Sequence, residues 1–259
     1  MGIINVTPDS FYDGGKTVND HQILARAQLM LEEGATFLDV GGYSSRPGAV
    51  HISETEEMER VIPAISSLMN EFPEALISVD TFRASVAKEA VACGAAMIND
   101  ISAGLMDKLM LHTVAELQVP YILMNMKGTP QTMRSLTQYE QITRDVVYYF
   151  SERLAACRKA GINDLIVDPG FGFSKTAAQS FELLNQLELL RILDLPLLVG
   201  VSRKSMIYKT LGVTSEEALN GTTALHAIAV LKGATILRVH DVKEAVECVS
   251  LVEKVKASS

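Results

Sequence analysis

Short apolar segments recur along the whole chain at regular intervals. Each is nearly continuous in apolar character and does not alternate between apolar and polar residues, which is typical of strands covered on both faces in a parallel sheet. Eight such segments predict eight strands, at residues 2–6, 36–40, 76–80, 96–100, 121–125, 164–168, 196–201 and 235–240.

The stretches between these strands carry helix signals. In residues 23–34, Ile23, Ala27, Met30 and Leu31 share one helical face before a glycine stops the pattern. Capping boxes at residues 53–56 and 214–217 indicate two further helix starts. Repeated strand–helix units of about 32 residues, with no linker-like stretch, predict one domain over residues 1–259. The fold class is α/β, a single (β/α)8 TIM barrel with eight parallel strands and a ring of outer helices; a doubly wound open sheet is the alternative.

Polar side chains stand where the apolar segments end. In a (β/α)8 barrel the chemistry lies at the carboxyl ends of the strands, so closure would bring these side chains to one rim. Any one of them could instead cap a helix. The residues in question are Asn5, Asp39, Asp80, Asn99, Asp100, Asn125, Asp168, Ser202, Lys204, Arg238 and His240.

Three of these side chains suit a flat, nitrogen-rich ring. Carboxylates of Asp80 and Asp168 can accept from ring N–H and amino groups, and Asn99 can both donate and accept. The triad therefore predicts a site that binds a heterocycle through hydrogen bonds. The alternative, that Asp80 or Asp100 only caps a following helix, remains open for one of the two.

The segments after the seventh and eighth predicted strands are cationic. Many barrels bind phosphate there, and the Lys204 ammonium and the Arg238 guanidinium suit a phosphate or pyrophosphate, whereas His240 could instead be a packed histidine. Two long polar, glycine-rich segments, 7–17 and 41–53, follow the first two strands and are typical of binding loops. Asn5 before the first of them, and Asp9 and Asp13 within it, offer hard oxygens, which predicts Mg²⁺ held jointly by one protein oxygen and a pyrophosphate.

Composition narrows the function classes. The net charge is −8, and no stretch clusters Lys and Arg as a nucleic-acid footprint requires. The apolar runs fall far short of the roughly 18 residues that span a bilayer. Three well-separated cysteines, Cys93, Cys157 and Cys248, offer neither a disulfide framework nor a CxxC motif. We therefore expect a soluble cytoplasmic protein that binds small molecules, with no nucleic-acid or membrane partner.

Seven segments, read in order, resemble the dihydropteroate synthase family. Single segments such as VDPG carry little information, but the first loop together with the SRK and RVH motifs is highly specific. The matching segments are MGIINVTPDSFYDGG, DVGGYSSRPGA, SVDTFR, MINDISAG, VDPGFGFSK, GVSRKSMI and LRVHDV, from residue 1 to 242.

The resemblance implies a reaction and a set of roles. The family joins p-aminobenzoate to the methylene of 6-hydroxymethyl-7,8-dihydropterin pyrophosphate, releasing pyrophosphate and making 7,8-dihydropteroate for folate synthesis; it is the target of sulfonamides. The catalytic set would be Asp80, Lys204, Arg238 and His240. By resemblance, the pterin would contact Asp80, Asn99, Asp168 and Lys204. The pyrophosphate would contact Asn5, Ser45, Arg46, Arg238 and His240. The p-aminobenzoate would contact Phe11, Pro47, Phe173, Lys204 and Ser205, and Mg²⁺ would be held by Asn5.

The charges predicted for this rim favour a dissociative displacement. Breaking the methylene–oxygen bond leaves positive charge on the pterin methylene and negative charge on pyrophosphate. Mg²⁺ and Arg238 would stabilise the leaving group, and Asp80 would offset the positive charge. The resemblance also implies a homodimer formed by the last helices, where Ile228, Leu231 and a valine stripe could be either interface or core.

Two readings compete with this one. A pterin-dependent methyltransferase reads the same ring but has no pyrophosphate to bind, which the cationic SRK and RVH segments argue against. A catalytically silent pterin-binding barrel would not need the intact Asn5, Lys204, Arg238 and His240. One departure stands out, because Tyr43-Ser44-Ser45 replaces the Glu-Ser-Thr of many family members.

Overall fold

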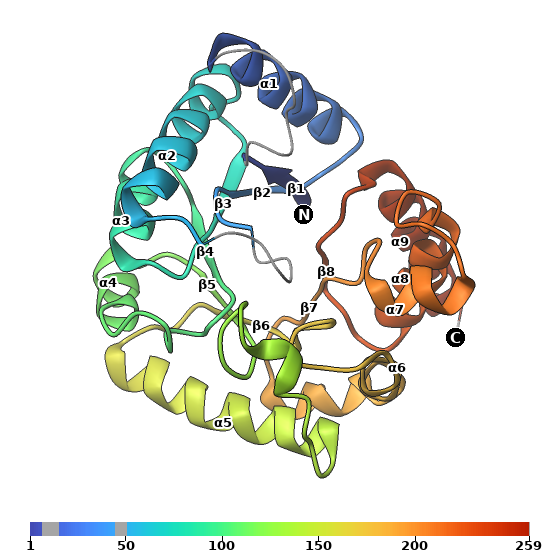
Figure 1. Cartoon of the computed structure of the whole chain (residues 1–259). Coiled ribbons are helices and arrows are strands. Elements are labelled where there is room, and N and C mark those ends of the chain that lie inside the picture. The colour runs from blue at the N-terminus through green and yellow to red at the C-terminus, as the bar shows by residue number, and fades with distance from the viewer. Residues whose placement is uncertain (7–15, 45–50, 259) are drawn as a thin grey trace.

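Parallel strands form the inner wall of the protein and helices surround it (Figure 1). The computed structural model describes residues 1–6, 16–44 and 51–258. In this part of the chain, the strands are β1 (Gly2–Asn5), β2 (Phe37–Gly41), β3 (Leu76–Asp80), β4 (Met97–Asp100), β5 (Tyr121–Met124), β6 (Leu165–Asp168), β7 (Leu198–Val199) and β8 (Ile236–Leu237).

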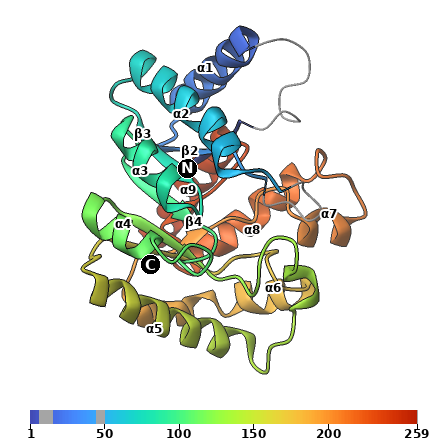
Figure 2. The ribbon, with the colours of Figure 1, turned by 60° about the vertical axis from the view of Figure 1, so that its left-hand side comes forward.

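The helices follow the strands in the order that the sequence predicts. Figure 2 shows the same outer layer from a second direction. The helices are α1 (Lys16–Glu32), α2 (Glu54–Glu71), α3 (Ala84–Ala92), α4 (Met110–Leu117), α5 (Ile142–Ala160), α6 (Ala177–Asn185), α7 (Ser205–Leu211), α8 (Leu219–Leu231) and α9 (Val242–Lys256), with short 3-10 helices η2 (Met133–Ser135) and η3 (Leu187–Leu193). The eight predicted strands are thus present in the described residues, and the TIM-barrel class is confirmed.

The ring of strands is joined unevenly. Strands β1 to β6 pair in sequence order, with up to five residue pairs between β2 and β3. The pair β7–β8 joins this sheet through single bridges, Val167 with Leu197 on one side and Gly2 with Val239 on the other. Residues 197–239 therefore meet the rest of the wall at two narrow seams.

The strand interior changes from apolar to polar along the barrel axis. Near the strand starts, Met97, Ile122, Ile166 and Leu198 pack together, with Phe37 against them. Further along, the register sets Asp39 beside Ser78 and Asp80 beside Asn99. Because side chains two apart in a strand share a face, the apolar layer and the polar layer lie on the same inner wall.

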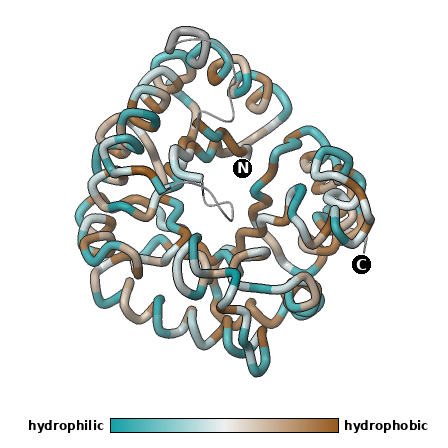
Figure 3. Tube along the Cα trace, in the orientation of Figure 1, coloured by the Kyte–Doolittle hydropathy of each residue, from teal (hydrophilic) through white to brown (hydrophobic). Residues whose placement is uncertain are grey.

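The larger core lies between the strands and the helices. Helix α2 shows how the sequence builds it: Val61, Ala64, Ile65 and Leu68 fall on one face and are buried. The hydropathy colouring of Figure 3 shows the apolar strands inside and many hydrophilic segments on the outer helices. None of the helices in the described ranges is long and apolar enough to cross a membrane.

The two predicted capping boxes have different outcomes. The Ser53 hydroxyl accepts from the Glu56 amide at 3.1 Å, and α2 begins beside it. At the second, Thr214 and Glu217 exchange hydrogen bonds, yet α8 begins only at Leu219. At the first, the Ser53 bond caps the helix while the Glu56 side chain pairs with Arg60. At the second, both bonds of the capping box form, but they close a turn instead of starting the helix.

A buried ion pair joins α2 to the segment after β3. The Glu57 side chain is fully buried and accepts from Arg83 Nη1 at 2.5 Å and from Thr81 Oγ1 at 2.6 Å. Arg83 also donates to the carbonyls of Ile52 at 2.6 Å and Ser53 at 3.0 Å. Burial raises the pKa of Glu57, and the Thr81 hydrogen bond and the Arg83 charge oppose that rise. Arg83 thus fixes the start of α2 against β3.

Replacing Arg83 by Met should destabilise the fold strongly. The change leaves the Glu57 carboxylate buried without its cation, which costs about 3–5 kcal/mol of unfolding free energy. Arg144→Met is the matched control, because its pair with Glu140 is exposed and contributes at most about 1 kcal/mol. Urea unfolding measures both. Equal losses in the two variants would contradict the role given to Arg83.

Candidate active site

Arg238 lies at the centre of the polar layer inside the barrel. Its Nε donates to Asp39 Oδ2 at 2.6 Å and its Nη2 donates to Asp80 Oδ2 at 2.7 Å. Asn99 Nδ2 donates to the same Asp39 oxygen at 3.1 Å. One guanidinium thus links β8 to β2 and β3, and Asp39 links β2 to β4.

The strand register explains why these four side chains meet. Asp80 is paired with Gly41 on one side and Asn99 on the other. A Cβ at Gly41 would lie 3.3 Å from the Asp80 Cβ, so the glycine leaves the space that the Asp80 side chain uses. Arg238 follows β8, which reaches β1 and β2 only because the wall closes.

Two carboxylates share one guanidinium, and burial shapes the protonation of Asp80. Burial raises the pKa of Asp80 to about 7; Arg238 opposes the rise and Asp39 adds to it. Burial alone would lower the pKa of Arg238, but Asp39 and Asp80 together raise it. Among the described residues, no hydrogen-bond partner meets the buried Asp39 Oδ1. The cluster is therefore rich in acceptors.

A second cation lies beside the end of β6. Lys204 Nζ donates to the Phe171 carbonyl at 2.6 Å and lies 4.8 Å from the centroid of the Phe173 ring. Burial lowers the pKa of Lys204 to about 8, against the opposing charge of Asp168. Burial likewise raises the pKa of Asp168, against the charge of Lys204. The pair places an ammonium, a carboxylate and an aromatic ring at one edge of the polar layer.

The turn after β6 is held by a lysine to which the sequence analysis gave no role. Lys175 Nζ is buried and donates to Asn125 Oδ1 at 2.7 Å and to the Gly170 carbonyl at 3.1 Å. Burial lowers its pKa to about 7. Gly170 has φ +69°, and a Cβ there would lie 2.1 Å from the Asn125 carbonyl oxygen. The β5 and β6 ends therefore approach more closely than any other residue at position 170 would permit.

His240 and Ser202 form a third group at the rim. The Ser202 hydroxyl lies 3.0 Å from His240 Nδ1, and it accepts from the His240 amide at 3.2 Å. The neighbouring Arg203 instead makes two 2.8 Å bonds to Asp241. Arg203 thus ties the start of α9 in place, whereas Lys204 faces the site.

The structure brings most of the predicted residues to one end of the barrel. Asp80, Asn99 and Arg238 share one hydrogen-bonded cluster. Lys204 lies near the Phe173 ring and interacts electrostatically with Asp168. Ser205 begins α7, and Asn5 ends β1, paired with Gly41. Asp9, Phe11, Asp13, Ser45, Arg46 and Pro47 lie outside the described residues. Their predicted roles remain predictions.

Asp39 and Asp100 both lie in strands but have different roles, because one holds site residues and the other orders its own turn. Asp100 accepts from the Ser102 amide and hydroxyl, the Gly104 amide and the Tyr121 hydroxyl, so it orders its own turn. Asp39 holds Arg238 and Asn99 instead, although its place at a strand end had predicted only that it lies on the rim. The alternation Asp39-Val40-Gly41 was the available signal, since it sets Asp39 on the face that Gly41 leaves open.

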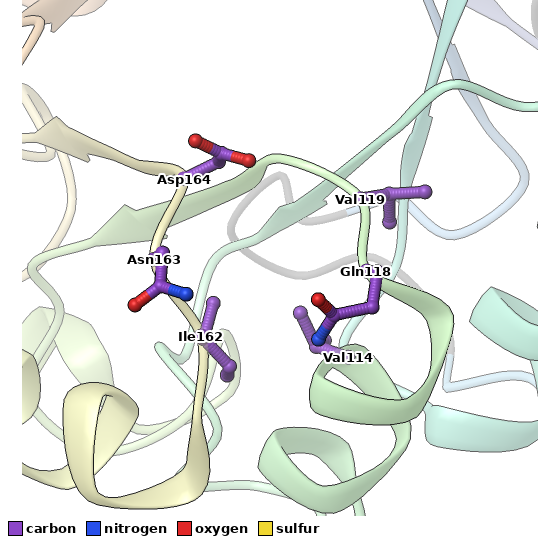
Figure 4. Close-up of a pocket in the computed structure, with 6 residues that line it drawn as sticks. All are labelled: Val114, Gln118, Val119, Ile162, Asn163 and Asp164. Carbon is purple, nitrogen blue, oxygen red and sulfur yellow. The ribbon is translucent and has the colours of Figure 1, made fainter.

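The described residues contain no group of three or more His, Cys, Asp and Glu side chains that could hold a metal ion. A small pocket of about 30 Å³ lies elsewhere, lined by Val114, Gln118, Val119, Ile162, Asn163 and Asp164 (Figure 4). These residues precede β5 and β6, so this pocket is at the opposite end of the strands. It has room for about one water molecule.

A barrel that places a carboxylate–amide layer and two cations at its carboxyl end is the kind of protein that reads a polar ring, and the comparison of families agrees. The model of the family described as pterin binding enzyme matches residues 1–240. The chain therefore belongs to the pterin-binding enzymes.

Its similarity to individual proteins is more specific. Dihydropteroate synthase of Escherichia coli (strain K12) is 46% identical over 255 residues, which cover 98% of this chain and 90% of that protein. The structure of Yersinia pestis dihydropteroate synthase with a sulfonamide drug complex matches with a TM-score of 0.93 and 44% identity, covering 99% of this chain and 93% of that one. The Xanthomonas albilineans enzyme in complex with 7,8-dihydropteroate matches with a TM-score of 0.89 and 39% identity, covering 99% and 92%.

The chain is thus a member of the dihydropteroate synthase family. The resemblance inferred from the seven segments is confirmed.

Asp80 should make stability depend on pH. Its pKa near 7 exceeds the ordinary 3.8, so the folded chain binds more protons between these values and loses stability as pH rises through that range. Asp80→Asn removes this contribution, and the difference in unfolding free energy between the wild type and the variant should then change by up to about 1.4 kcal/mol per pH unit. Urea unfolding from pH 4.5 to 7.5 measures it. Parallel curves for the two proteins would contradict the raised pKa.

Proposed function

We propose that the chain condenses 6-hydroxymethyl-7,8-dihydropterin pyrophosphate with p-aminobenzoate, releasing pyrophosphate and forming 7,8-dihydropteroate. The observation that carries this proposal is the cluster of Asp39, Asp80, Asn99 and Arg238 beside Asp168 and Lys204, in a chain of the dihydropteroate synthase family. The cluster combines ring-reading acceptors with cations.

The pterin ring would bind against the acceptor-rich layer. The carboxylates of Asp80 and Asp168 would accept from the amino and ring N–H groups, and Asn99 would present its amide. Asp168 already accepts from the Gly170 amide at 2.8 Å, which fixes the orientation of its carboxylate. Lys204 would lie on the p-aminobenzoate side of the ring, where its distance from Phe173 supports contact with both substrates.

The pyrophosphate would lie toward Arg238 and His240. Arg238 is held by Asp39 and Asp80, so its remaining donor capacity is oriented before the substrate arrives. Ser202 orients the His240 ring. Ser45 and Arg46 would complete this set. Arg238 therefore couples the pterin side of the site to the pyrophosphate side.

The donor set fits Mg²⁺ only when the substrate shares it. Asn5, half-buried at the end of β1, offers one neutral hard oxygen, and the described residues provide no cluster that could hold the ion without further ligands. Asn5 would therefore hold Mg²⁺ together with pyrophosphate oxygens. When bound, the ion neutralises charge on the leaving group.

p-Aminobenzoate would enter beside Phe173, with Phe11 and Pro47 completing an apolar slot and Ser205 near its carboxylate end. Its aniline nitrogen is neutral at pH 7 and needs positioning more than deprotonation. As the methylene–oxygen bond breaks, positive charge develops on the pterin methylene and negative charge on pyrophosphate. Asp80 would offset the first and Arg238 the second, which favours a dissociative displacement.

We also propose that the chain acts as a cytoplasmic homodimer. On α9, Val242, Ala245, Cys248 and Val252 are buried and form the core face. Val246 on α9 and Ile228 and Leu231 on α8 are 38%, 39% and 50% exposed, which supports an interface there. The three cysteines are free thiols, which supports a reducing compartment.

Removing a ring-reading side chain should weaken pterin binding. Asn99→Ala and Asp168→Ala each leave substrate donors or acceptors unpaired in a buried site, and each should lose about 1–3 kcal/mol of binding free energy. Calorimetric titration with 6-hydroxymethylpterin measures the loss. Asn163→Ala, at the opposite end of the barrel, is the control and should bind normally. Normal affinity in both site variants would refute the assignment.

The reaction itself is tested by pyrophosphate release. With dihydropterin pyrophosphate, Mg²⁺ and p-aminobenzoate, the wild type should release pyrophosphate and form dihydropteroate in equal amounts. Omitting p-aminobenzoate should abolish dihydropteroate formation. A chain that binds the pterin but forms no dihydropteroate would instead be a silent pterin-binding barrel.

A further inference from the structure

Tyr43 is a buried aromatic side chain just after β2, at the position where this chain departs from the Glu-Ser-Thr pattern. It is 8% exposed. Its ring meets Phe82 edge to face, with centroids 5.0 Å apart at 84°, and His51 at 5.8 Å and 71°. The Arg83 guanidinium carbon lies 5.6 Å from the ring centroid. The ring therefore contacts three side chains that lie after β2 and β3.

The Tyr43 hydroxyl bridges two segments that are far apart in sequence. It accepts from Gln131 Nε2 at 2.6 Å and lies 3.2 Å from His51 Nδ1. Gln131 belongs to the segment after β5, just before η2. A phenol can accept one hydrogen bond while donating another, so one oxygen connects both neighbours. The hydroxyl thus fastens the segment after β5 to the segment after β2.

The fastened segment packs toward the predicted p-aminobenzoate slot. Tyr43, Met133 of η2, and Met124 and Met126 at the end of β5 belong to one rim cluster, together with Ile52, Phe82 and Ile101. Phe173 packs against this rim cluster and lies 4.8 Å from Lys204 Nζ. Tyr43 therefore reaches Phe173 through packed side chains of the rim cluster. In the sequence, Tyr43 comes before residues 45–50, which contain Pro47, and His51 comes directly after them.

We propose that Tyr43 is a positioning residue for p-aminobenzoate, acting through Gln131 and the rim cluster on Phe173. The pterin-reading residues Asp80, Asn99 and Asp168 lie on the strands and have bonds of their own, so they do not depend on this link. Losing the hydroxyl therefore affects the second substrate and spares the first. The inference rests on the proposed synthase reaction.

Steady-state kinetics of Tyr43→Phe test the proposal. The variant keeps the ring and loses the hydroxyl, so the KM for p-aminobenzoate should rise about threefold to tenfold, the effect of one lost hydrogen bond. The kcat and the pterin Kd should change less than about twofold. Gln131→Ala should give the same rise, and the double variant no more than either single one. Tyr148→Phe is the matched control, because that hydroxyl lies on the exposed face of α5.

Several results would overturn the inference. One is an unchanged KM for p-aminobenzoate in Tyr43→Phe. Another is a loss of pterin affinity as large as the rise in that KM. A third is a double variant in which the two rises in KM add. If the wild type shows no turnover, the proposed function fails instead, and hydrogen exchange of residues 129–135 in the free chain then decides on the link. Faster exchange in Tyr43→Phe than in Tyr148→Phe supports the link, and equal exchange overturns it.

Discussion

The sharing of Arg238 by Asp39 and Asp80 is the interaction on which the arrangement of this barrel depends. Buried carboxylates are costly without a cation, and here two of them meet one guanidinium at 2.6 and 2.7 Å. The cation comes from β8, while its partners come from β2 and β3. Closing the wall of strands and neutralising its polar layer are therefore the same event. The positions of these site residues therefore depend on how the wall of strands closes.

The balance of carboxylates and cations also bears on the chemistry proposed for the rim. Three carboxylates, those of Asp39, Asp80 and Asp168, meet the two cations Arg238 and Lys204 in the polar layer, so a ring that offers several N–H groups would supply further donors. Lys204 and Asp168 extend this toward Phe173, where the environment becomes apolar. In the proposed function, a polar ring and an aromatic amine would thus bind to neighbouring surfaces, with the cations beside the leaving group.

The regular spacing of apolar segments predicted the strands, and the polar residues at their ends predicted most of the rim. Both are local signals in the sequence. The pairing of Arg238 with Asp39 spans 199 positions and depends on ring closure, which no local pattern records. Lys175 was missed because its partners, Asn125 and Gly170, come from two different strand ends. At Thr214, local capping bonds were correct, but packing set the true start of α8.

The two narrow seams beside β7 and β8 have a consequence for assembly of the protein. Strands β1 to β6 carry the acceptors Asp39, Asp80, Asn99 and Asp168, whereas residues 197–239 carry both Lys204 and Arg238. A chain emerging in order would expose Asp39 and Asp80 without their shared cation until its last quarter arrives. Opening at the seams would separate the same two parts of the barrel, so partial unfolding would remove Lys204 and Arg238 together.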